Sequence, residues 1–126
     1  MARLTKRFPM EHHIQPRGWG HERWIENLPE YCGKQLVIDP GKRGSLHFHV
    51  NKTETMWVTS GTMTIRLVDT DTGEEYPLIL AVGDSLLLRP GQPHQICNED
   101  PDNPLVLIEF STTHEETDSR RVRKGD

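Results

Sequence analysis

The chain has 126 residues, a formal net charge of −4, and 33% hydrophobic against 27% charged residues. This balance fits one soluble globular domain with a single core, and its acidity argues against nucleic acid, which normally needs a basic face. No apolar run approaches the roughly 18 residues of a membrane span, and the basic start lacks the apolar segment of a secretory signal. Two cysteines without a CxxC pair predict reduced thiols and a cytoplasmic location.

The first predicted elements precede any candidate site. Residues 1–16 mix charge, proline and histidine without periodicity, so we predict an N-terminal arm that is flexible or lies across a partner subunit. Strands are then expected over 21–27 and 34–38, with a proline-containing connector between them and a turn after the second.

Two histidines share one face of the next predicted strand. His47 and His49 are two residues apart, and on an extended strand residues i and i+2 point to the same side. A returning strand over 53–59 can bring the carboxylate of Glu54 opposite the two rings. Such residues are singly more often exposed polar groups, but together they make most of a site for a divalent transition metal.

Alternation of apolar and polar residues continues further along the chain. It predicts a strand over 62–69, joined by a turn at 70–73 to a second strand over 75–80. Another strand is expected over 85–89, and it meets a Pro-Gly-Gln-Pro turn. His94 follows this turn directly, which makes it the fourth candidate metal ligand.

The last predicted strand covers 105–110, and the tail over 113–126 is expected to be a short helix or an ordered extension. Short strands with frequent turns and no amphipathic helix indicate an all-β sandwich or barrel. The predicted barrel domain is 17–112. Because open strand edges are a liability, the extra strand over 19–27 is expected to pair with a second subunit, which gives a homodimer.

Two blocks of the sequence resemble the signature of the cupin family over residues 34–111. The matching positions are Gly41, His47, His49, Glu54, Gly61, Gly83, Gly91, His94 and Asn98. The resemblance implies a single cupin barrel, a jelly roll also called a double-stranded β-helix, which holds one divalent ion of Mn, Zn, Fe, Ni or Co. The metal ligands that it implies are His47, His49, Glu54 and His94.

A more local resemblance is to the cupin domain of type II mannose-6-phosphate isomerases. Residues 17–20 are similar to the motif that opens that domain, and residues 106–110 to its closing strand. The further matching positions are Lys34, Pro40, Gly41, Ser45, Leu46, His49, Glu54, Trp57, Ser60, Gly61, Thr62, Asp118 and Arg121. The resemblance implies a metal-dependent enzyme that isomerises or epimerises a small sugar or sugar phosphate. Those isomerases usually carry Gln at the position of His47.

An isomerase also needs a base that moves a proton next to the substrate carbonyl. Glu109 on the last predicted strand is the first candidate, and Lys52 and His21 follow it. The alternative for Glu109 is a rim carboxylate paired with Arg66 or Arg89. These two arginines are candidates for holding an anionic group of the substrate, or else they face solvent.

Two other functions fit the same residues. A dioxygenase with Fe(II), Mn or Ni is one alternative, because three histidines and one carboxylate leave two positions on Fe(II) for substrate and O₂. The second is a non-catalytic cupin that binds a sugar or another small molecule. Of these classes, the complete ligand set favours an enzyme.

Overall fold

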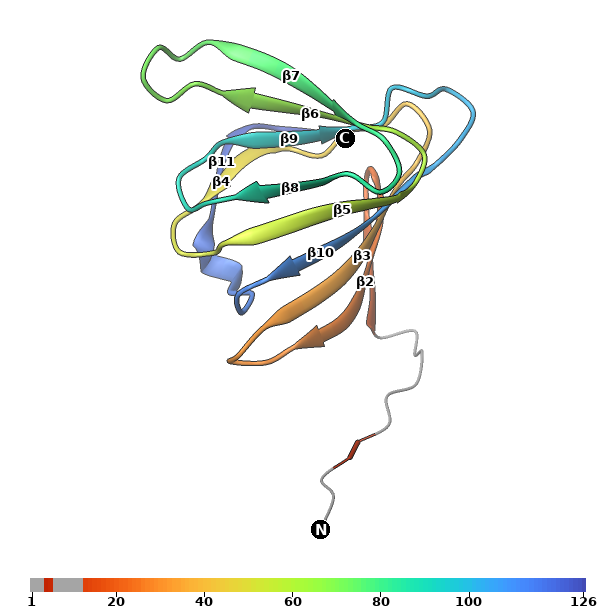
Figure 1. Cartoon of the computed structure of the whole chain (residues 1–126), viewed down its shortest axis with the longest axis vertical. Coiled ribbons are helices and arrows are strands. Elements are labelled where there is room, and N and C mark those ends of the chain that lie inside the picture. The colour runs from red at the N-terminus through yellow and green to blue at the C-terminus, as the bar shows by residue number, and fades with distance from the viewer. Residues whose placement is uncertain (1–3, 6–12) are drawn as a thin grey trace.

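The computed structural model describes residues 4–5 and 13–126, and nearly all regular structure within them is β (Figure 1). The strands in chain order are β1 (Ile14–Arg17), β2 (Gly20–Asn27), β3 (Cys32–Ile38), β4 (Leu46–His49), β5 (Glu54–Ser60), β6 (Met63–Val68), β7 (Glu75–Leu80), β8 (Ser85–Leu88), β9 (His94–Cys97), β10 (Leu105–Ser111) and β11 (Ser119–Arg123). A short 3-10 helix, η2 (Glu116–Asp118), precedes β11. The predicted all-β class is confirmed.

The strands form two antiparallel sheets that face each other. Within residues 13–126, the larger sheet has the order β1-β2-β3-β10-β5-β8 and the smaller has the order β11-β4-β9-β6-β7. From β3 onward the chain passes repeatedly from one sheet to the other, so each sheet interleaves strands that are distant in sequence. Figure 1 shows the two layers, with β5, β8 and β10 in one and β6, β7 and β9 in the other. This is the winding of the predicted jelly roll.

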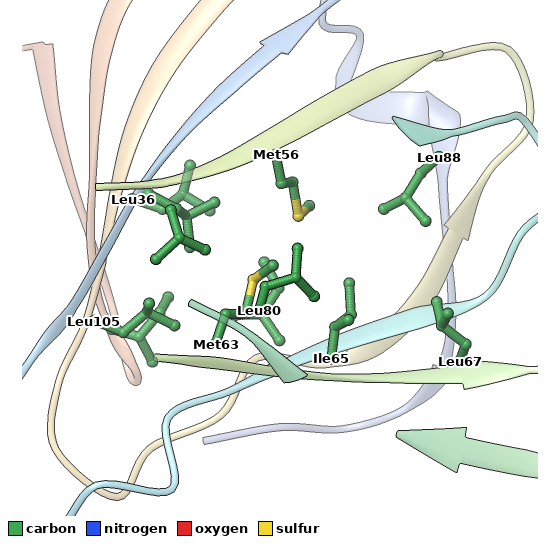
Figure 2. Close-up of a cluster of buried hydrophobic side chains, with 12 residues drawn as sticks. Leu36, Met56, Met63, Ile65, Leu67, Leu80, Leu88 and Leu105 are labelled. Carbon is green, nitrogen blue, oxygen red and sulfur yellow. The ribbon is translucent and has the colours of Figure 1, made fainter. Parts of the chain in front are cut away.

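Alternating side chains build the core between the sheets. On β6, Met63, Ile65 and Leu67 are buried while the residues between them are partly exposed. They face Met56 and Leu88 of the opposite sheet, as Figure 2 shows. The other members of this apolar cluster are Leu36, Ile38, Val58, Leu80, Ile96, Leu105 and Leu107.

The inward-facing rows become polar at one end of the barrel. On β3, the buried row runs from Lys34 through Leu36 to Ile38, and on β5 it starts at Glu54. Glu109 of β10 lies directly opposite Lys34 in the antiparallel register. The exposed fractions of Lys34, Glu54 and Glu109 are only 2%, 1% and 5%. The register therefore gathers buried charges at one end of the core.

Three strands in the structure were not predicted. β1 lies in the segment assigned to the arm and pairs with β2, so the expected edge strand over 19–27 is flanked on both sides in the described part of the chain. β9 carries His94, and β11 continues the small sheet beside β4. Residues 1–3 and 6–12 of the predicted arm lie outside the described residues. No helix within the described residues is long and apolar enough to cross a membrane.

Candidate metal centre

Three histidines meet at the polar end of the barrel. His47 and His49 lie on β4, and His94 begins β9, where it is the register partner of His47. One ring nitrogen from each histidine lies within 4.8 Å of the other two. The ring centroids are 5.0 Å apart for His47 and His49 and 4.6 Å apart for His47 and His94. The strand pairing thus brings three candidate ligands to one point.

The fourth candidate ligand, Glu54, approaches the same point from the opposite sheet. Its Oε1 lies 2.9 Å from Nε2 of His94 and 3.7 Å from Nε2 of His49. Ions of this class hold nitrogen and oxygen ligands at about 2.0–2.2 Å, which places neighbouring ligand atoms roughly 3 Å apart. The separations around Glu54 are therefore close to those of atoms that share one ion.

Hydrogen bonds to backbone carbonyls set the orientation of two of the rings. Nδ1 of His47 lies 3.1 Å from the Ser45 carbonyl, and Nδ1 of His94 lies 2.9 Å from the Gln92 carbonyl. Since a carbonyl oxygen only accepts, each Nδ1 carries the proton and each Nε2 is left as the possible ligand atom.

Several buried atoms at this point have no hydrogen-bond partner among the described residues. They are Nδ1 of His49, Nε2 of His94 and both carboxylate oxygens of Glu54. The 2.9 Å approach of His94 to Glu54 is not aligned as a hydrogen bond, although it is short enough for one. Nδ1 of His49 faces Asp118 at 3.5 Å, whereas a bound cation would compensate Nε2 of His94 and the oxygens of Glu54. Three imidazoles with one carboxylate suit Mn, Fe, Co, Ni or Zn. The residues present therefore fit a divalent ion.

The protonation states of three of the four candidate ligands also suit a metal; for His94, burial acts to lower the pKa, but the carboxylate of Glu54 raises it. Burial and the charge of His94 lower the pKa of His47 to about 4, and burial and Lys52 lower the pKa of His49 to about 3. Burial acts to raise the pKa of Glu54, but His94 outweighs it and lowers that pKa to about 2. At neutral pH His47 and His49 are therefore neutral imidazoles and Glu54 is a carboxylate, as metal binding requires.

A cavity of about 410 Å³ opens beside His47. Part of its wall is apolar and comes from the barrel core and the segment before β2: Trp19, Leu36, Ile38, Met56 and Ile96. Another part carries buried or half-buried charged and polar groups: Lys34, Lys52, Glu109 and His114. A small polar molecule in this cavity would lie between the candidate metal ligands and these groups.

The two residues predicted to act in proton transfer lie together in this wall. Nζ of Lys52 is 3.4 Å from Oε2 of Glu109 and 3.6 Å from Oε2 of Glu54. Burial and the charge of Glu54 raise the pKa of Glu109. For Lys52, burial acts in the opposite direction, but Glu109 and Glu54 raise its pKa. Lys52 is thus a charged bridge between the candidate metal centre and Glu109.

The other residues suggested for substrate binding or proton transfer lie away from the cavity. Arg66 on β6 alternates with the buried row, so it points outward, where its Nε lies 3.9 Å from Glu75. Arg89 is exposed just after β8, and neither arginine lines the cavity. The suggested pairing of Glu109 with these arginines is replaced by its contact with Lys52. His21 is absent from the cavity wall as well.

Three polar residues around this site had no predicted role there: Lys34, His114 and Asp118. Lys34 had a usable signal, because it shares the parity of the buried Leu36 and Ile38 on its strand. His114 and Asp118 follow the last predicted strand in a polar segment, so alternation gave no signal for them, and Asp118 stood out only as a position of the family resemblance. They reach the site only because β11 folds back onto β4.

Asp118 holds the turn that follows β4. Its Oδ1 accepts a hydrogen bond from the backbone N–H of Asn51 at 2.7 Å, and its Oδ2 accepts one from the backbone N–H of Lys52 at 3.1 Å. The same Oδ2 lies 3.5 Å from Nδ1 of His49. A carboxylate behind a ligating imidazole typically fixes the orientation of the ring and strengthens the ligand. Asp118 is therefore placed to orient His49.

We expect the Asp118→Asn variant to bind metal about 10–100-fold more weakly, because His49 loses the carboxylate behind its ring. Competition with a chromogenic chelator measures this change directly. The matched control is Asp71→Asn, which changes an exposed turn residue and should leave the affinity unaltered. An Asp118→Asn protein that folds and keeps the full affinity would exclude this role.

Comparisons with known proteins support the same barrel. Residues 35–111 match the family model of the Cupin domain. A putative mannose-1-phosphate guanylyltransferase from Vibrio cholerae is 31% identical over 103 residues, which cover 81% of this chain and 20% of that protein. The chain therefore spans about a fifth of the length of this curated relative.

Solved structures share the fold at low sequence identity. The capsular polysaccharide assembling protein CapF from Staphylococcus aureus superposes with a TM-score of 0.78 and 18% identity, covering 87% of this chain and 34% of its own. Oxalate decarboxylase from Bacillus subtilis gives 0.73 and 18%, with coverages of 87% and 30%. A conserved protein with a double-stranded β-helix domain from Klebsiella pneumoniae gives 0.72 and 18%, with coverages of 98% and 100%. These likenesses show the fold alone.

Proposed function

Because this chain belongs to the cupin family, we propose that it is a metal-dependent enzyme that isomerises or epimerises a small sugar or sugar phosphate. The observation that carries the proposal is the position of the buried pair Lys52–Glu109, between the candidate ligand Glu54 and a cavity of sugar size. Two relatives point to carbohydrate chemistry by name, one through mannose 1-phosphate and the other through capsular polysaccharide. This agreement supports the proposed substrate class.

In this proposal four residues hold one divalent ion of Mn, Fe, Co, Ni or Zn: His47, His49, Glu54 and His94. When bound, such an ion supplies Lewis-acid polarisation of a substrate carbonyl and its neighbouring hydroxyl. The carbonyl partners of His47 and His94 keep both rings directed at the same point.

Residues of the cavity wall carry out the proton transfer and exclude water. In an isomerisation, Glu109 takes the proton from the carbon next to the carbonyl and returns it to the former carbonyl carbon, which is general base and then general acid catalysis. The proton of the neighbouring hydroxyl moves to the former carbonyl oxygen in the same conversion. The raised pKa of Glu109 suits this task, because a buried carboxyl binds a proton more readily than an exposed one. Lys52 holds the carboxylate in place at 3.4 Å. The apolar side chains of Leu36 and Met56 limit the access of water to the reacting carbon.

Proton exchange with solvent tests this function. Candidate sugars and sugar phosphates are incubated in D₂O with the metal-loaded protein and followed by NMR. The proposal predicts metal-dependent deuterium incorporation at the carbon next to the carbonyl, and its loss in Glu54→Gln and His94→Ala. Oxygen uptake by an Fe(II) form without deuterium incorporation would indicate a dioxygenase instead. Sugar binding without either reaction would indicate a non-catalytic binding protein.

The proposed setting is a homodimer in the cytoplasm. Both cysteines, Cys32 and Cys97, are buried and free, which supports a reducing compartment. β1 ends the larger sheet within the described residues, and such an edge can pair with a second copy. Light scattering should therefore give twice the monomer mass for the intact protein and a shift toward monomer after deletion of residues 1–17. A monomeric intact protein at micromolar concentration would rule the dimer out.

A further inference from the structure

Two buried lysines face one histidine in the cavity, beyond the four candidate metal ligands. Nζ of Lys34 lies 3.3 Å and Nζ of Lys52 lies 3.4 Å from Nδ1 of His114. An ammonium group only donates hydrogen bonds, so this Nδ1 accepts from both and His114 is neutral. Its other nitrogen, Nε2, lies 3.2 Å from the carboxylate of Glu116. Two cationic donors therefore converge on a single uncharged acceptor.

Lys34 is only 2% exposed but has no close carboxylate partner among the described residues, although the charge of Glu109, its register partner on β10, also acts on it. The nearest carboxylate oxygen with which it pairs belongs to Glu22 and lies 4.0 Å away. The other oxygen of Glu22 already accepts from Arg17 at 3.1 Å and from Trp24 at 3.2 Å. Nζ of Lys34 also lies 4.0 Å from the Trp24 ring centroid, a contact that offsets only part of the cost of burying a charge.

Lys52 differs from Lys34 in having two carboxylates close to it, those of Glu54 and Glu109. With a divalent ion bound at Glu54, the positive charge of the ion and the two lysines exceeds the negative charge of these carboxylates. The charged groups at the cavity rim do not correct this excess, because acidic and basic residues are equally numerous there. The rim groups are Arg17, Arg121, Lys124, Glu22, Glu116 and Asp126.

We propose that Lys34, together with Lys52, binds an anionic group of the substrate, either a phosphate or a carboxylate. An anion oxygen accepts from an ammonium group more strongly than the neutral Nδ1 of His114 does, so it takes over one or both donors. Lys34 and His47 line the same cavity, so a small molecule can reach both at once. The inference rests on the proposed function, because it assigns the charge of that substrate.

Calorimetric titration of the cobalt-loaded protein tests the site without an activity assay. The probes are inorganic phosphate and glycolate, a small hydroxy acid, with chloride as the salt control. We expect at least one probe to bind, and Lys34→Met to weaken its binding at least tenfold. The matched control, Lys42→Met, removes an exposed lysine and should change the affinity by less than twofold. Preference between the probes identifies the anionic group as phosphate or carboxylate.

A second measurement covers the case in which Lys34→Met does not fold. Because Nζ of Lys34 lies over Trp24, an anion that draws the ammonium away should change the tryptophan emission of the unaltered protein. The Trp24→Phe variant should show a clearly smaller change and keep its affinity for the anion within a few-fold. An emission change of undiminished size in Trp24→Phe would contradict the proposed contact, since Trp19, which also lines the cavity, can account only for a remainder.

Anion binding and deuterium exchange test the anion site and the isomerase separately. Absence of binding by both probes, or equal affinities of Lys34→Met and the unaltered protein, would overturn the anion site even if sugars exchange deuterium. Conversely, Lys34-dependent anion binding by a protein that exchanges no deuterium would support the site and reject the isomerase.

Discussion

Replacement of both His47 and His49 by alanine is expected to reduce the metal content from close to one ion per chain to nearly none. The double variant loses two of the four ligands, and Glu54 with His94 alone provides too few donors for a stable site. The loss should exceed the roughly 10–100-fold weakening expected for Asp118→Asn, which acts only through one ligand. Elemental analysis after reconstitution with Mn, Fe, Co, Ni or Zn in turn measures it.

The matched control for this experiment is His21→Ala. His21 lies on β2 and outside the cavity wall, so its loss should leave the metal content unchanged. Retention of a full ion by a folded His47→Ala, His49→Ala protein would show that the ion binds elsewhere.

Replacement of Glu109 by glutamine is expected to lower the rate of deuterium exchange about 10²–10⁴-fold, which is the usual contribution of general acid–base catalysis. Glutamine keeps the size of the side chain but cannot take up the substrate proton. Lys52 keeps its second carboxylate partner, Glu54, at 3.6 Å, so the variant is expected to fold. Exchange is measured by NMR as for the unaltered protein.

Metal content separates a catalytic role of Glu109 from a structural one. Glu109→Gln should retain its ion, because Glu109 is not among the four candidate ligands, and Glu99→Gln, an exposed loop substitution, should exchange at the normal rate. Unaltered exchange by Glu109→Gln would transfer the role of base to another residue. Loss of the ion together with exchange would make Glu109 a support of the metal centre instead.

Side-chain alternation is the reason that much of the fold was predictable. The spacing of Met63, Ile65 and Leu67 indicates a strand with one buried face, and the structure shows that face in the core. The same rule applied to His47 and His49 places both on one side of β4, where their rings lie 5.0 Å apart. Local sequence carries this information, because the period of a strand is set by its own backbone.

The groups that define the cavity depend instead on pairing between distant segments. Lys34 and Glu109 are neighbours only through the register of β3 and β10, and Lys34 meets His114 only because the chain turns back after β10. Arg66 illustrates the opposite error, since its charge suggested a binding role while its parity directs it outward to Glu75. By side-chain alternation alone, Lys34 is a better candidate than Arg66 for a residue that faces the cavity.

The most direct test of the metal centre is anomalous diffraction from crystals of the protein grown with cobalt or zinc. We predict a single strong peak within about 2.0–2.3 Å of Nε2 of His47, His49 and His94 and of a carboxylate oxygen of Glu54. A structure without this peak, in which a doubly protonated His94 donates Nε2–H to Glu54 in its place, would contradict this prediction.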